Sequence, residues 1–208
     1  MISLFTNLQQ ATAQNVERLL PLVSPQRRDE ALRYKHVLGQ FTCLQSYYML
    51  HTMLVEMDAI RPNQYPQFQR NTHGKPSLEG LPHIHFNISH CKEAIAVIVD
   101  SSPVGIDVES FRAPSESLLQ YTMCPSERDT IRQAEHPDQA FALYWTKKEA
   151  LFKLIGTGIT HQIPDLLQHI PSHIELTSTL HPHFALTIAQ QRADSSQSNG
   201  SLEVEIIK

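Results

Sequence analysis

Two acidic side chains, Asp107 and Glu109, are separated by one residue in the apolar segment 105–109. Residues two positions apart in a strand share a face, so both carboxylates project to one side while Ile106 and Val108 point to the other. Two carboxylates about 5 Å apart repel each other by roughly 3 kcal/mol at an effective dielectric constant of about 20. A hard divalent cation would offset this repulsion. The pattern indicates either a metal site or a solvated strand face with two acids.

A third carboxylate and a lysine lie on one stripe of a predicted helix. Trp145, Glu149 and Lys153 follow one another at intervals of four residues, which places them on the same helical face. A cation held by acidic side chains, with an ammonium group beside it, would neutralise the oxygens of a bound diphosphate. Taken alone, the helix is also explained by an ordinary Glu-to-Lys pair, worth about 0.2–0.5 kcal/mol, with the tryptophan as a core anchor.

Two further segments offer ligands for phosphate groups. The segment 73–76 predicts a rigid turn that exposes Lys75 beside Pro76, and a predicted strand ends with Ser89 and His90. A serine hydroxyl donates without charge, whereas histidine can donate as a cation. Each segment could equally be an ordinary turn or strand end.

Zinc is the alternative ion for the histidines. His83, His85 and His90 could serve as ligands, but the first two are explained as one polar strand face and no ligand-rich partner segment stands out. The cysteines are odd in number, lie far apart and form no CxxC pair, at positions Cys43, Cys91 and Cys124. This argues against a thiolate zinc site and a disulfide framework, and a reducing cytoplasm fits best.

Composition excludes several classes of protein. The 208 residues are 41% hydrophobic and 18% charged, which favours a packed core over disorder. A formal net charge of −4 argues against a protein whose main role is to coat nucleic acids or other polyanions non-specifically. No secretory signal is evident at the start, and the longest apolar run, residues 94–99, is far too short to span a membrane. The two common glycine-rich nucleotide-binding fingerprints do not occur in the sequence.

Two α+β halves, residues 1–101 and 102–208, are expected to meet near residues 100–103 with a site at the seam. Ser24 and Pro25 begin a long amphipathic helix to about Met57, after a short strand and helical piece, and residues 61–82 read as loop. A second helix, 141–155, stops at Gly156. The expected strands are 83–88, 94–99, 104–109, 173–177, 184–189 and 202–207, with a polar hairpin tip at 193–201.

In combination and order, these motifs resemble the 4′-phosphopantetheinyl transferase superfamily, in particular its monomeric, surfactin-synthetase-activating type. The motifs that carry the resemblance are Gly74-Lys75-Pro76, Phe86-Asn87-Ile88-Ser89-His90, Gly105-Ile106-Asp107-Val108-Glu109 and Trp145-Thr146-Lys147-Lys148-Glu149-Ala150. The resemblance implies a pseudo-two-fold fold of two similar α/β halves. It also implies an Mg²⁺-dependent enzyme that transfers phosphopantetheine from coenzyme A to a serine of an apo acyl or peptidyl carrier protein. Adenosine 3′,5′-bisphosphate is the by-product.

The resemblance further implies residue roles. The metal ligands would be Asp107, Glu109 and Glu149, with Lys153 on the diphosphate and protonating the leaving group. Coenzyme contacts would come from Ser89 on the diphosphate, His90 on the 3′-phosphate, Lys75 and Pro76 bordering the adenine and 3′-phosphate region, and Lys148, which matches the motif.

Three expectations remain open. Glu127 either positions or deprotonates the carrier serine, alone or with Glu149, or is a surface acid. The resemblance also implies that basic residues of the first long helix hold the 3′-phosphate; Lys35 and Arg33 are favoured among five candidates, Arg27, Arg28, Arg33, Lys35 and His36. Segment 110–125, with Met123 and Cys124, is expected to contact the carrier protein. A member that binds coenzyme A or a carrier protein without transferring anything is the alternative function.

Overall fold

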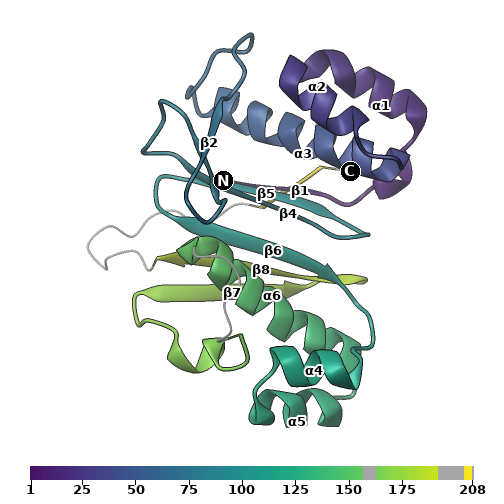
Figure 1. The fold of residues 1–208 in the computed structure, drawn as a ribbon, viewed down its shortest axis with the longest axis vertical. Helices are drawn as coiled ribbons and strands as arrows, with labels where there is room; N and C mark the ends of the chain where they lie inside the picture. The colour runs from purple at the N-terminus through teal and green to yellow at the C-terminus, as the bar shows by residue number, and fades with distance from the viewer. Residues whose placement is uncertain (157–162, 192–203, 208) are drawn as a thin grey trace.

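A computed structural model describes residues 1–156, 163–191 and 204–207 (Figure 1). Its first sheet has the strand order β4 (His85–His90), β5 (Ile95–Asp100), β1 (Ile2–Phe5) and β9 (Val204–Ile207). The first three strands pair antiparallel, and β9 lies parallel to β1. The continuous apolar run of β5 is explained by its position, because its side chains are buried on both faces of this sheet.

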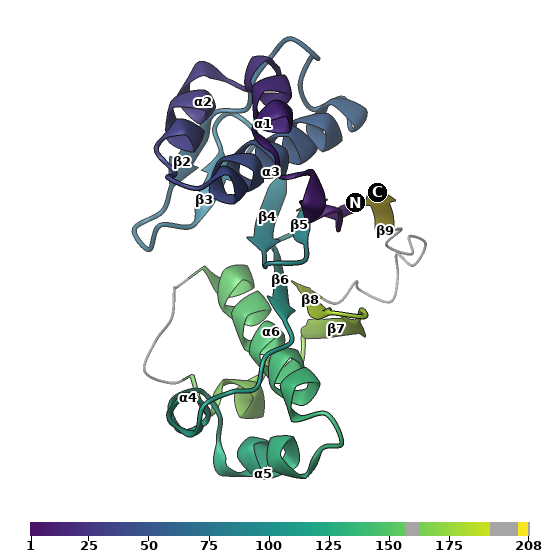
Figure 2. The same cartoon turned by 90° about the vertical axis from the view of Figure 1, so that its right-hand side faces the viewer.

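Helix α3 (Val37–Glu56) covers one face of this sheet (Figures 1 and 2), and α1 (Ala13–Leu19) and α2 (Pro25–Leu32) pack against α3. Ser24 caps α2 as predicted, since its hydroxyl accepts from the Arg27 amide at 3.2 Å. The prediction of one helix from 25 to 57 is wrong, because the chain turns at residues 33–36. Gln40 donates to the Tyr34 carbonyl at 2.9 Å across this turn.

The predicted loop 61–82 contains a small hairpin, formed by β2 (Phe68–Arg70) and β3 (Pro76–Leu78). Its tight turn is held by Asn71, whose side-chain oxygen accepts from the amides of His73 and Lys75, each at 2.9 Å. Gly74 adopts a φ of 85°, which explains the glycine in this turn.

The second sheet has the order β6 (Val104–Ser110), β8 (Phe184–Gln191) and β7 (Ile174–Leu180), all antiparallel. Helix α6 (Pro137–Ile155) packs directly on β6, and Gly105 permits this close approach. A Cβ at that position would lie 2.0 Å from the Ala150 carbonyl oxygen. Gly156 ends α6 with a φ of 75°, as expected for a C-terminal glycine. Three short elements were not expected: α4 (Glu116–Thr122), α5 (Pro125–Gln133) and a 3-10 turn (Leu166–His169).

The two sheets meet where β4 lies beside β6 (Figures 1 and 2). Side chains of β4 satisfy backbone amides of β6 here: Asn87 accepts from the Ile106 amide at 3.2 Å, and Ser89 from the Val108 amide at 3.3 Å. An apolar cluster packs beneath the junction, built from Ile2, Leu4, Ala96, Ile98, Ile106, Val108 and neighbours. This junction fixes β6 relative to β4.

The structure is a mixed α+β fold, as predicted. The last described strand belongs to the first sheet, so β8 and β9 do not form the expected hairpin. The hairpin tip predicted at 193–201 lies outside the described residues. The boundary expected between residues 101 and 102 stays a prediction. Among the described helices, none has the length and apolarity needed to cross a membrane.

Candidate active site

A cavity of about 340 Å³ opens at the junction of β4, β6 and α6. It collects most of the residues singled out from the sequence: Trp145, Glu149 and Lys153 from α6, Asp107 and Glu109 from β6, and Ser89 and His90 from β4. The period of two in β6 and the period of four in α6 thus present their acids to the same space. Three carboxylates from two distant segments face one cavity.

The centre of this site is a hydrogen-bonded group of Asp107, Lys153 and Ser89. The Lys153 ammonium donates to Asp107 Oδ1 at 2.7 Å, to Ser89 Oγ at 2.9 Å and to the Ile106 carbonyl at 3.2 Å. The Ser89 hydroxyl donates to the same Asp107 oxygen at 2.7 Å. Asp107 is only 5% exposed, so this charge is held in place by an opposite charge and by hydrogen bonds.

The three acids share a shift in acidity. Burial raises the pKa of Asp107, although the neighbouring Lys153 ammonium lowers it. Burial also raises the pKa of Glu149, and repulsion from Asp107 and Glu109 raises it further. The pKa of Glu109 is raised by burial, against the Arg112 guanidinium 3.4 Å away. Removing negative charge, or adding positive charge to the cavity, would therefore reduce the repulsion among these carboxylates.

Oxygen donors of this kind suit a hard cation. Within the part of the chain that the structure describes, however, no three His, Cys, Asp or Glu side chains are gathered closely enough to hold a metal as they stand. Asp107 is also paired with Lys153. The carboxylates thus fit Mg²⁺ in donor chemistry and in facing one cavity, but not as a closed cage. The same finding speaks against a zinc site at His83, His85 and His90.

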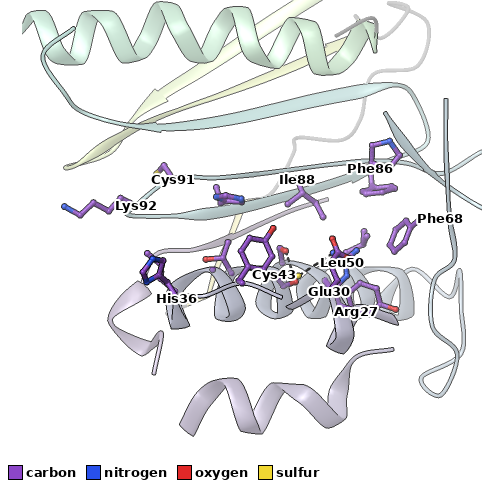
Figure 3. A pocket seen from close by; sticks show the side chains of 18 of the residues that line it. Arg27, Glu30, His36, Cys43, Leu50, Phe68, Phe86, Ile88, Cys91 and Lys92 are labelled. Atoms are coloured by element: carbon purple, nitrogen blue, oxygen red, sulfur yellow. Dashed lines mark hydrogen bonds and ion pairs between the residues drawn. The ribbon is translucent and has the colours of Figure 1, made fainter. Parts of the chain in front are cut away.

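Figure 3 shows a second, larger cavity of about 860 Å³. It adjoins the first, since Ile88 and His90 line both. Its wall combines aromatic and basic side chains: Tyr34, Tyr47, Phe68 and Phe86 with Arg27, Lys35, His36, Arg70 and Lys92. The Arg27 guanidinium lies over the Tyr47 ring, 5.0 Å from its centroid. Flat apolar surface beside several cations suits a phosphorylated nucleotide.

Only some of the predicted coenzyme ligands line the larger cavity. Lys35, Pro76 and His90 line the larger cavity, whereas Arg33 is exposed at the end of α2 and is not among the described lining residues. Lys75 lines neither cavity and donates to the Leu154 carbonyl at 2.9 Å. The contacts predicted for Arg33 and Lys75 are therefore not supported by the geometry.

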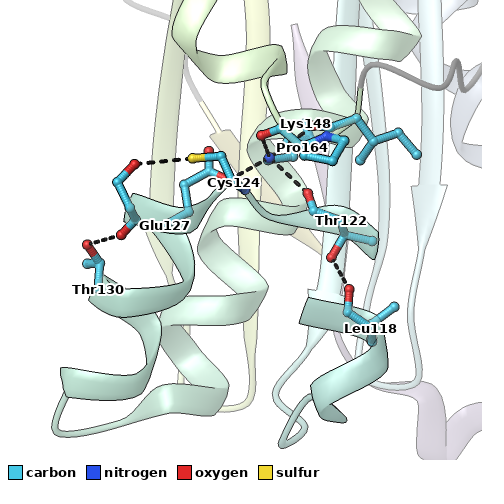
Figure 4. Close-up of polar contacts among 9 residues, drawn as sticks. Leu118, Thr122, Cys124, Glu127, Thr130, Lys148 and Pro164 are labelled. Atoms are coloured by element: carbon cyan, nitrogen blue, oxygen red, sulfur yellow. Dashed lines mark hydrogen bonds and ion pairs between the residues drawn. The ribbon is translucent and has the colours of Figure 1, made fainter. Parts of the chain in front are cut away.

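Lys148 and Glu127 form a separate buried pair (Figure 4). The Lys148 ammonium lies 2.6 Å from Glu127 Oε2 and within 3.0 Å of three carbonyl oxygens, those of Thr122, Ile163 and Pro164. Glu127 also accepts from the Cys124 amide at 3.0 Å, which caps α5. Neither residue lines the cavities described above. The geometry therefore does not support the predicted coenzyme contact of Lys148 or the predicted catalytic role of Glu127, because the two side chains are paired with each other.

Four basic residues of the larger cavity were not selected from the sequence. Arg27 and His36 were candidates that were not favoured, and Arg70 and Lys92 were not considered. Arg70 stands in the hairpin that had been read as a loop, and Lys92 follows the end of β4. Recognising that residues 68–70 and 76–78 pair as a hairpin would have placed Arg70 beside Pro76, which was already a predicted coenzyme contact.

Comparison with known proteins gives the family. Residues 103–203 match the family model of the 4′-phosphopantetheinyl transferase superfamily. The chain is 29% identical over 177 residues to 4′-phosphopantetheinyl transferase psf-1 of Bacillus pumilus, covering 84% of this chain and 76% of the relative. It is 31% identical over 147 residues to a 4′-phosphopantetheinyl transferase of Bacillus subtilis, with 69% and 65% covered.

A third relative, 4′-phosphopantetheinyl transferase Sfp of Bacillus subtilis strain 168, is 25% identical over 146 residues, again with 69% and 65% covered. The chain thus spans just under two thirds of the two Bacillus subtilis relatives. Together with the four motifs and the cavity that they build, these similarities show that the chain belongs to the 4′-phosphopantetheinyl transferase superfamily.

Proposed function

We propose that this protein transfers the 4′-phosphopantetheine group of coenzyme A to a serine of an apo carrier protein. The serine oxygen attacks the phosphorus that carries the pantetheine arm. The bond from that phosphorus to the bridging oxygen breaks, and adenosine 3′,5′-bisphosphate leaves with the electron pair. The observation that carries the proposal is the convergence of Asp107, Glu109, Glu149 and Lys153 on one cavity, which shares lining residues with a larger basic and aromatic one.

The two cavities divide the coenzyme between them in this proposal. The adenine and the 3′-phosphate occupy the larger cavity, where Pro76 borders the base and Arg27, Lys35 and His90 reach the phosphate. The diphosphate lies in the smaller cavity against Ser89 and Lys153. His90 lines both spaces, and so stands where the two parts of the ligand would join.

Magnesium is the ion that suits this site. Asp107, Glu109 and Glu149 would hold it, and the diphosphate and water would complete its oxygen ligands. When bound, Mg²⁺ withdraws charge from the phosphoryl oxygens during displacement. It would also offset the negative charge of Asp107, which raises the pKa of both Glu109 and Glu149.

Two proton transfers fall to residues of this chain. Glu149 has a raised pKa and faces the cavity, so it is suited to accept the serine proton, directly or through a water. The Lys153 ammonium is held at Asp107 and Ser89, from where it can donate to the leaving oxygen. Glu127 takes no part, because its carboxylate is committed to Lys148.

The carrier protein would dock beside the small cavity. Met123 and Cys124, named from the sequence, are buried and cannot contact a partner, whereas Tyr121 of the same segment is 65% exposed on α4. The enzyme's net charge of −4 would not attract an acidic carrier, so we propose local, partly apolar docking at α4. A monomer of two pseudo-two-fold halves acting in the cytoplasm completes the proposal.

One observation favours the alternative of binding without transfer: Asp107 is already neutralised by Lys153. Mass spectrometry of an apo carrier protein incubated with this protein, coenzyme A and Mg²⁺ separates the two. A gain of one phosphopantetheine mass, lost when the carrier serine is replaced by alanine, establishes transfer. Tight binding of coenzyme A with an unchanged mass across acyl and peptidyl carriers would leave only the binding function.

A further inference from the structure

The hairpin of β2 and β3 contacts the end of α6, although more than seventy residues separate them in the sequence. Lys75 Nζ donates to the Leu154 carbonyl at 2.9 Å, and Asn71 Nδ2 donates to the Gly156 carbonyl at 3.2 Å. The two segments also touch closely, because a Cβ at Gly156 would lie 2.7 Å from Lys75 Cδ. Two side chains from the first half of the chain thus bind the last turn of a helix in the second half.

Helix chemistry explains why these residue types stand here. The last carbonyl groups of a helix have no partner within it, and they carry a partial negative charge that favours a cation. Lys75 supplies that cation and lies half-buried against the helix end, and burial lowers the pKa of its ammonium. Asn71 supplies a neutral donor while its side-chain oxygen holds the hairpin turn, accepting from the amides of His73 and Lys75.

The hairpin also forms part of the wall of the larger cavity. Phe68, Arg70 and Pro76 line the larger cavity, in which the coenzyme's nucleotide is proposed to bind. Arg70 and Pro76 are paired across the hairpin, directly beside the turn that carries Asn71 and Lys75. One small element therefore has the larger cavity on one side and the end of α6 on the other.

At the other end of the contact lies the proposed catalytic lysine. Leu154, whose carbonyl accepts from Lys75, directly follows Lys153, whose ammonium donates to Asp107 and Ser89. Glu149 lies one turn earlier on the same helix. Loosening of the last turn would therefore move Lys153 first, and a misplacement of about 1 Å can lower a rate by about a hundredfold.

We propose that Lys75 and Asn71 are positioning residues, which fix the last turn of α6 and so hold Lys153 against Asp107, and that Lys75 is not a ligand of the coenzyme. The inference rests on the proposed transfer for its kinetic part. Its structural part concerns only the coupling of the hairpin to α6 and can be measured without turnover.

The test compares Lys75→Met, Lys75→Arg and Asn71→Asp with wild type. Asn71→Asp keeps the oxygen that holds the turn but removes the donor to Gly156. His73→Ala is the matched control, because this exposed side chain lies in the same turn. For each, kcat and KM are measured with coenzyme A and with 3′-dephospho-coenzyme A, and hydrogen exchange is measured for the amides of residues 152–156.

We expect Lys75→Met and Asn71→Asp to lower kcat by about ten- to a hundredfold, by the same factor for both coenzymes, with faster exchange at 152–156. Lys75→Arg should restore most of the rate, and His73→Ala should change neither readout. A Lys75→Met variant that loses only its preference for coenzyme A over the dephospho form would make Lys75 a phosphate ligand and overturn the proposal.

Unchanged exchange at 152–156 in both Lys75→Met and Asn71→Asp would equally overturn it. If Lys75→Met does not fold, Asn71→Asp and Lys75→Arg decide by the same readouts. If wild type transfers nothing to any carrier, the proposed function fails, while the exchange comparison still decides whether the hairpin holds the end of α6.

Discussion

Lys153 and Asp107 are joined by a 2.7 Å contact that ties the last turns of α6 to β6. The ammonium has a second partner in Ser89 on β4, so one lysine connects three elements at the junction of the two sheets. A diphosphate entering this cavity would compete with Asp107 for the same ammonium group. We therefore expect the coenzyme to free the carboxylate at the moment when a metal ion could use it.

Replacing Asp107 by Asn tests this relationship. The variant keeps the size of the side chain but removes a metal ligand and the charge that holds Lys153. Metal-assisted stabilisation is worth several kcal/mol, so we expect the transfer rate to fall by at least about a hundredfold. Steady-state assays over a range of Mg²⁺ concentrations measure it, with Asp129→Asn at an exposed position of α5 as control. Near-normal rates at limiting Mg²⁺ would refute the metal assignment.

The raised pKa of Glu149 predicts a pH dependence of stability. A carboxyl whose pKa is higher in the folded state binds protons more tightly there, so the free energy of unfolding falls as pH rises from the unfolded pKa through the folded one. Glu149→Gln cannot ionise and should lack this contribution, unfolding at a higher temperature than wild type above that range.

Magnesium should act in the opposite direction on wild type. It binds the ionised acids, so the melting temperature should rise with Mg²⁺ at neutral pH and much less in Glu149→Gln. Thermal unfolding between pH 4 and pH 8, with and without Mg²⁺, is the measurement. A variant that melts below wild type throughout, with an undiminished Mg²⁺ response, would contradict the assignment of Glu149 to the site.

The basic wall of the larger cavity predicts recognition of the 3′-phosphate. Arg27→Ala and Lys35→Ala each remove a cation from this wall, and a charge-assisted contact is worth about 1.5–3 kcal/mol. We expect KM for coenzyme A to rise about tenfold or more, with little change in kcat.

The matching measurement uses 3′-dephospho-coenzyme A, for which KM should change much less. Arg18→Ala is the control, because Arg18 is exposed on α1 and contacts Asn15. Equal losses for the two coenzymes would mean that the basic side chain contacts a part of the coenzyme other than the 3′-phosphate. For Arg27, they could also mean that it acts through the Tyr47 and Phe68 rings, over which it lies.

Strands β5 and β6 could be predicted from the sequence because their signals are local. Ile106 and Val108 alternate with the two acids, and residues 94–99 are apolar throughout because β5 is buried on both faces. The break between α2 and α3 could not be predicted in the same way. It lies where the Tyr34 ring packs against Gly39, in a contact so close that a Cβ at Gly39 would lie only 2.8 Å from Tyr34 Cδ1.

In the site, too, residues placed by local geometry could be predicted, whereas residues brought together by the tertiary fold could not. The stripe of Trp145, Glu149 and Lys153 follows from helical geometry alone, and all three line the cavity. Lys148 was added by resemblance, although neighbouring residues of a helix point about 100° apart. The larger cavity was harder to foresee, because Arg27, Arg70 and Lys92 come from three separate segments that only the tertiary fold brings together.

The buried pair of Lys148 and Glu127 predicts a stability defect in place of a binding defect. Lys148→Met leaves the Glu127 carboxylate buried, with the Cys124 amide as its remaining partner within the described residues, and breaking such a pair costs about 3–5 kcal/mol. Lys147→Met is the matched control one residue away; that lysine lies beside the Tyr144 ring and should cost about 1 kcal/mol or less.

Urea unfolding measures both variants, and KM for coenzyme A is taken on the folded fraction. Adding Glu127→Gln to Lys148→Met removes the uncompensated charge and should recover part of the lost stability. This recovery would show that the defect arises from the buried carboxylate, because the carbonyls of Thr122, Ile163 and Pro164 lose their donor in the single and the double variant alike. A Lys148→Met variant with unchanged unfolding and a raised KM would instead return Lys148 to the coenzyme site.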